Sequence, residues 1–212
     1  MTPSDSIPDL RETLLAAWRT NSRVTSHLVE RIPPVLWDAA VPGAPRRTVR
    51  TMAAHLHNAR SRWIRTLGRE HGITAPPLVD PRRVEPRTLL AALERSGRGI
   101  EELLELGLAA GGRVPPSKGY VWRNLPLDVG HVLAYFVAHE GHHRGQIVMV
   151  ARQLGHPLPR EATDGLWQWA TRLREWAGRA EGRVEAPAGQ ARRRSRPSAG
   201  PRPAASTRGH LP

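Results

Sequence analysis

Apolar residues between residues 128 and 154 recur at intervals of three and four, which is the period of an α-helix with one buried face. This face consists of Val132, Phe136, His139, His143, Ile147, Val150 and Leu154. Residues four apart lie about one turn apart on the same side of a helix, so His139 and His143 can direct ring nitrogens at a single ion. The pattern therefore predicts a helix with a candidate pair of metal ligands among its core positions.

A second interpretation of the two histidines must be considered with the first. A buried imidazole loses its hydration, and hydrogen bonds to carbonyl groups or to buried water can replace that hydration as well as a metal can. The pair alone leaves both interpretations open. A third ligand elsewhere in the chain would favour the metal.

The segment from residue 48 to residue 68 supplies a candidate for that third ligand. Its apolar stripe runs through Met52, His55, Ala59 and Trp63, so His55 again occupies a core position. His57 lies about 200° around the helix from His55 and cannot share its face. We therefore predict His55 as the ligand and His57 as a surface or helix-contact histidine.

Three imidazoles would leave coordination positions open on a divalent ion. Structural zinc sites usually have four protein ligands, whereas three protein ligands and an open position are typical of catalytic zinc. The chain has no Cys that could complete a closed site. Zinc and nickel are both suited to imidazole ligands. Gln146, three residues after His143, is a candidate to support a ligand by hydrogen bonding.

Two motifs that contain these histidines resemble a known family. The sequence His-Leu-His-Asn-Ala-Arg-x-x-Trp begins at His55, and His-Glu-Gly-His-His-Arg-Gly-Gln-Ile begins at His139. Together they resemble the DinB/YfiT-like family, the damage-inducible DinB family of metal-dependent proteins, over roughly residues 8–157. The resemblance places the family's ligands on His55, His139 and His143.

The resemblance also implies a fold and a range of functions. It implies an all-α, antiparallel up-down four-helix bundle, one bound divalent ion and a homodimer. Some relatives are S-transferases or isomerases that use low-molecular-weight thiols. We therefore expect a metal-dependent hydrolase or a thiol-dependent transferase that acts on a small-molecule substrate. The alternative is a non-catalytic metal-binding protein or a nucleic-acid-associated basic protein.

Glu140 is the candidate catalytic residue, and it raises a rival assignment. With its neighbours it completes His-Glu-x-x-His, the zincin protease motif, in which the Glu is the general base. Gln146 and Met149 stand where the elongated form of that motif needs Gly and His, and no strand-rich lobe is evident, so a protease is disfavoured. Within a helical bundle, Glu140 is either a base beside the metal or, as we favour, a solvated or interhelical carboxylate.

The remaining segments of the chain are also expected to be mostly helical. Helices are expected at about 7–32, 85–106 and 166–177, with a Pro/Gly/Arg-rich loop at 33–47 and a long Pro-containing connection before residue 85. From Gly182 onward the chain has seven Arg against Glu185 alone and no aromatic residue. We predict a bundle domain at 1–181, with an additional C-terminal helix, and a disordered tail at 182–212.

The composition of the chain limits its expected cellular location and its expected binding partners. The net charge is +13, but a single Lys stands against thirty-one Arg, which indicates a compositional bias rather than a nucleic-acid site. Nucleic-acid contact is therefore expected only as nonspecific binding through the tail. The absence of Cys, of a long apolar run and of a signal-peptide pattern predicts a cytoplasmic protein without a membrane partner.

Overall fold

The computed structural model describes residues 9–121 and 123–184, and these residues are mostly helical with one small two-stranded sheet. Of the tail predicted at 182–212, residues 182–184 are the end of the last helix, and residues 185–212 lie outside the described residues. The elements in chain order are α1 (Leu10–Val29), α2 (Pro34–Trp37), β1 (Ala40–Val41), β2 (Ala44–Thr48), α3 (Val49–Gly68), a short 3₁₀ turn (Arg69–His71), α4 (Pro86–Ala109), α5 (Val129–Gln153), α6 (Arg160–Gly165) and α7 (Trp169–Val184).

Local sequence signals set the ends of the two helices that carry the candidate ligands. At the start of α3, the Thr48 hydroxyl accepts from the Thr51 amide at 3.2 Å, and the Thr51 hydroxyl accepts from the Thr48 amide at 2.9 Å. This reciprocal cap satisfies two amides that the helix leaves unpaired. At the end of α5, Gly155 adopts a φ of +74°, and the next amide, of His156, donates to the Ala151 carbonyl. Both ends agree with the sequence prediction.

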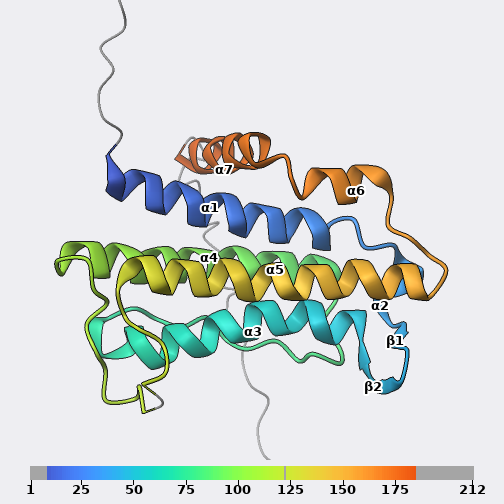
Figure 1. The fold of residues 1–212 in the computed structure, drawn as a ribbon, viewed down its shortest axis with the longest axis horizontal. Helices are drawn as coiled ribbons and strands as arrows, with labels where there is room; N and C mark the ends of the chain where they lie inside the picture. The colour runs from blue at the N-terminus through green and yellow to red at the C-terminus, as the bar shows by residue number, and fades with distance from the viewer. Residues whose placement is uncertain (1–8, 122, 185–212) are drawn as a thin grey trace, which may run out of the picture.

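Helices α1 and α5 lie against each other and run in the same direction. Trp18 packs on Phe136, and one turn further along both helices Asn21 donates to Glu140. Figure 1 shows these two helices and α3 and α4 aligned along the long axis of the molecule, with α6 and α7 on the outer side of α1.

Helices α3 and α4 also run in the same direction. Residues later in α3 contact residues later in α4. His57 meets Ser96, and further along Ile64 lies against Gly99. The expected up-down order is therefore wrong at this step: the four long helices run up, down, down and up.

The connection between α3 and α4 explains this correction. Residues 72–85 return alongside α3, where the Pro77 carbonyl meets His57 and Val79 exchanges hydrogen bonds with Asn58. A short loop would have placed α4 antiparallel to α3, whereas this long segment carries the chain back to the first end of α3 before α4 begins.

A small hairpin interrupts the segment predicted as a loop. Strands β1 and β2 pair antiparallel around Pro42-Gly43, where Gly43 has a φ of +75°. The strands have only two and five residues, and β2 has the sequence Ala-Pro-Arg-Arg-Thr. Such a strand has no alternation of apolar and polar residues, so sequence periodicity could not have predicted it.

Two apolar clusters fill the interior at opposite ends of the long helices. One includes Leu28, Met52 and Ile147, and the other includes Trp18 and Phe136. On α1, α3 and α5, the residues between these clusters are polar and buried: Asn21, Ser22, Thr25, His57, Arg60, Ser61, Glu140 and Arg144. We call this set the polar layer.

Among the described residues, no helix is both long and apolar enough to cross a membrane.

Candidate metal centre

Three imidazoles from two helices converge beside the polar layer. His55 extends from α3, and His139 and His143 extend from α5, with one ligand atom of each lying within 4.8 Å of the other two. The Nε2 atoms of His55 and His139 are 3.2 Å apart. These three residues are the ones predicted as ligands, and the structure brings all three together.

The three rings are suited to a divalent ion by their protonation state as well as by their positions. Burial, followed by the neighbouring His143 and His139 rings, lowers the pKa of His55 to about 4. Burial also lowers the pKa of His139 and of His143. All three imidazoles are therefore neutral near pH 7, which is the form that binds metal.

Gln146 supports His143 from one turn further along α5. The Gln146 Oε1 atom lies 3.0 Å from Nδ1 of His143, so that Nδ1–H donates and Nε2 remains available as the ligand atom. The same oxygen accepts from Arg47 Nη2 at 2.7 Å, and the amide nitrogen of Gln146 lies 2.9 Å from Nε2 of His142. Partners of this kind fix the orientation of a ligating ring.

An aromatic pair borders the site next to His139. The Tyr135 ring stacks on His139 with a centroid separation of 5.9 Å and an interplanar angle of 14°. Trp63 donates to the Tyr135 hydroxyl at 3.3 Å. Tyr135 was not among the predicted site residues, although its position four residues before His139 places it on the same helix face.

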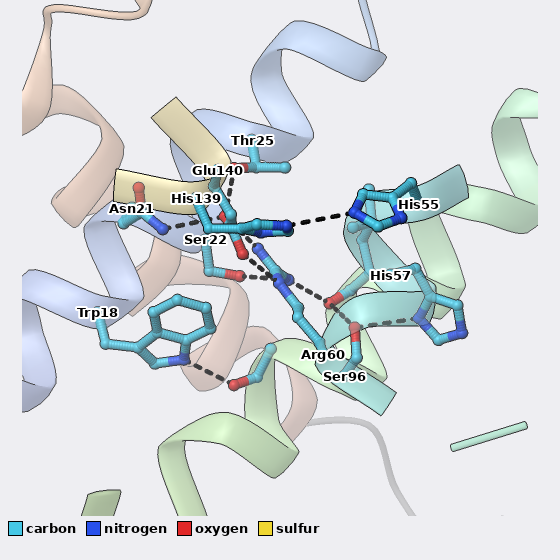
Figure 2. A network of polar contacts seen from close by, with 12 residues as sticks. Trp18, Asn21, Ser22, Thr25, His55, His57, Arg60, Ser96, His139 and Glu140 are labelled. Carbon is cyan, nitrogen blue, oxygen red and sulfur yellow. Dashed lines mark hydrogen bonds and ion pairs between the residues drawn. The ribbon is translucent and has the colours of Figure 1, made fainter. Parts of the chain in front are cut away.

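Glu140 lies inside the protein and is engaged by other side chains. It is 0% exposed, and Arg60 donates to both of its carboxylate oxygens at 2.6 and 2.7 Å. Asn21 and Thr25 donate to Oε2 as well. Figure 2 shows the carboxylate directed toward Arg60, while the preceding side chain, His139, points to His55.

These contacts decide between the roles considered for Glu140. Burial alone would raise its pKa, but the Arg60 guanidinium holds the pKa of Glu140 below its ordinary value. A carboxylate held in this way is an interhelical ion-pair partner, and its oxygens are not free to accept a proton beside the metal. The geometry therefore also disfavours the zincin assignment.

His57 is buried, so the surface alternative was wrong and the helix-contact alternative is confirmed. Its side chain is 0% exposed, its Nε2 donates to the Pro77 carbonyl at 2.9 Å, and its Nδ1 lies 3.1 Å from the Ser96 hydroxyl on α4. Figure 2 shows it directed away from His55. Both ring nitrogens are occupied by protein groups, which leaves no ligand atom for an ion.

A cavity of about 740 Å³ lies elsewhere, between α1, α4 and α7. Leu90, Leu173 and Trp176 form part of its wall, and none of the three candidate ligands lines it. The charged groups at its rim, such as Arg19 and Glu101, pair with each other. The cavity is therefore separate from the cluster of imidazoles.

Comparison with known families agrees with this geometry. The model of the DinB superfamily matches residues 17–147, a range that contains His55, His139 and His143. Comparison with curated proteins and with solved structures gives no significant match. The family match covers more than half of the chain, and the chain belongs to the DinB superfamily.

Proposed function

We propose that this protein binds one divalent metal ion, zinc or nickel, through His55, His139 and His143, and that it is a metalloenzyme. The observation that carries the proposal is the convergence of three neutral imidazoles within 4.8 Å of one another. Three protein ligands leave coordination positions for a substrate, which is the arrangement of catalytic metal sites.

The chemistry follows from the ion and from the residues around it. A bound divalent ion would supply Lewis-acid chemistry that activates a water molecule or a thiol as nucleophile. Gln146 orients His143, Tyr135 forms a wall beside His139, and Glu140 ties α5 to α3 through Arg60. The sequence has no Cys, so a thiol would come from a cosubstrate. Hydrolysis and thiol transfer are therefore the proposed reaction classes.

The proposal includes a finer description of the fold and assembly. We propose that α1, α3, α4 and α5 form a four-helix bundle of the up-down-down-up order described above. We also propose a cytoplasmic homodimer. Trp167 is 82% exposed, and the nearby Trp169 and Leu173 are also exposed, which supports an apolar contact surface near α7. Light scattering of the purified protein measures the assembly.

Elemental analysis after exhaustive dialysis tests the metal centre. Wild-type protein is compared with His55→Gln, His139→Gln and His143→Gln, and His131→Gln is the matched control because His131 is exposed on the same helix and is not one of the converging imidazoles. We expect about one equivalent of metal in wild type and control, and loss in the other three. Wild-type protein that retains none, even after reconstitution with zinc or nickel, would overturn the proposal.

Turnover is tested on the metal-loaded proteins. Screens with ester, amide and thiol-acceptor substrates should give activity in wild type and in His131→Gln, and none in the three ligand variants. Metal binding without turnover in any screen would favour the non-catalytic alternative.

A further inference from the structure

The candidate metal centre has no anionic ligand. Its three candidate ligands are imidazoles, which bind a metal as neutral rings, so a bound divalent ion keeps its full charge. The carboxylate next in sequence to a ligand, Glu140, already pairs with Arg60 at 2.6 Å. Arg144 approaches the same carboxylate at 3.7 Å and adds a second cation. The centre therefore has an excess of positive charge that an anionic ligand would compensate.

Arg47 lies at the edge of this centre, and its contact with Gln146 uses only part of its N–H donors. Its Nη2 donates to the Gln146 oxygen that also holds His143. Its side chain is exposed, and among the described residues no carboxylate lies within ion-pair distance of it. A guanidinium has five N–H donors in a planar fork that matches an anionic oxygen group, and the contact with Gln146 uses one of them.

Arg62 adds charge on the same side of α3 as His55. Seven residues separate the two, so they share a helix face about 10 Å apart. Arg62 is exposed and, within the described part of the chain, has no carboxylate at ion-pair distance.

We infer that the metal centre takes a small dianionic substrate or cosubstrate, with one anionic group at the open coordination positions and an outer carboxylate or phosphate-like group on Arg47. Arg62 attracts the same molecule through its field. This inference rests on the proposed metal centre and specifies the ligand class of that site. It makes Arg47 a binding residue for substrate and Arg62 a steering residue.

Calorimetric titration of the metal-reconstituted protein tests the inference. The probes are succinate, 3-phosphonopropionate and the neutral analogue succinamide. We expect both dianions to bind at least tenfold more tightly than succinamide, and the stronger of the two identifies the outer group as a carboxylate or as a phosphate-like group. The His143→Gln protein, which lacks a ligand, should lose dianion binding.

Arginine variants separate the two roles. Arg47→Gln should weaken dianion binding roughly tenfold, as expected for loss of a charge-assisted hydrogen bond, and Arg47→Lys should restore part of it. Arg62→Gln should weaken binding less and mainly at low salt. Arg46→Gln and Arg65→Gln are the matched controls: both residues are exposed, and Arg46 points to the other side of β2.

Metal content, measured on every sample, separates this inference from the proposed function. Equal binding of succinate and succinamide by metal-loaded wild type would overturn the inference while the metal centre stands. Equal effects of Arg47→Gln and Arg46→Gln would overturn the role of Arg47. Wild-type protein without metal would overturn the proposed function, and the inference with it.

Discussion

Arg60 holds Glu140 through two hydrogen bonds in the interior of the protein, from Nε to Oε1 at 2.6 Å and from Nη2 to Oε2 at 2.7 Å. The pair joins α3 to α5 at the level where His55 meets His139. It also lies between the two apolar clusters, within the polar layer. The ion pair therefore fixes the relative position of the two helices that carry the ligands.

Removing the charge of Glu140 should destabilise the fold. In Glu140→Gln, the Arg60 guanidinium stays buried without its counter-ion, which costs about 3–5 kcal/mol when a buried pair loses one partner. Urea unfolding of the metal-free protein measures this cost. Asp164→Asn is the control, because the Arg160–Asp164 pair is largely exposed and should contribute little. Equal stabilities of the two variants would contradict the structural role of Glu140.

Replacing His57 should separate folding from metal binding. His57→Ala removes a fully buried ring and leaves the Pro77 carbonyl without its donor, which costs about 1–3 kcal/mol or more. The metal content should remain near one equivalent, because His57 is not one of the converging imidazoles. Elemental analysis and urea unfolding of the same sample check both parts. Loss of metal from a folded His57→Ala protein would mean that the ligand set is wrong.

Gln146 should control metal affinity without being a ligand. In Gln146→Ala, His143 loses the acceptor that orients its ring, and loss of such a partner typically weakens metal binding 10–100-fold. Competition with a metal indicator of known affinity measures the change. Gln153→Ala, an exposed position on the same helix, should match wild type. A Gln146→Ala affinity equal to that control would remove Gln146 from the site.

His27 should make the attachment of α6 and α7 sensitive to acid. Its Nδ1 accepts from Arg172 of α7, and its Nε2 lies 3.3 Å from the Glu161 carbonyl of α6. Burial and the charges of Arg172 and Arg31 lower the pKa of His27 below its ordinary 6.5. Below pH 6.5 the unfolded chain therefore binds more protons than the folded one, and stability falls as the pH falls toward the folded-state pKa.

A comparison at two pH values checks the contribution of His27. Metal-free wild type should exceed His27→Asn in stability at pH 8, and the difference should shrink at pH 5.5. Using the difference removes the contributions of the other histidines, which both proteins share. His131→Gln is the control at an exposed position of α5. A wild-type advantage that is the same at both pH values would show that His27 does not titrate on unfolding.

Most helix boundaries were predictable because they depend on neighbouring residues. Helix α3, which Thr48 caps, spans the predicted segment 48–68, and α5 ends before Gly155, close to the predicted end at residue 154. The helices predicted at 7–32 and 85–106 correspond to α1 and α4, with ends shifted by a few residues. The helix predicted at 166–177 corresponds to α7, which the short helix α6 precedes. Caps, glycines and apolar periodicity act over one or two turns, so a linear sequence records them.

The sequence by itself determined the pairing of His139 with His143, because four residues of one helix place two side chains on one face whatever the rest of the chain does. Only the tertiary structure decided that α3 and α4 run parallel, that His57 is buried against α4, and that Glu140 binds Arg60. These features join residues 39 and 80 positions apart. Local periodicity specifies which residues share a face of a helix. The residues that this face contacts depend on the return of the chain along α3 and on the packing of whole helices.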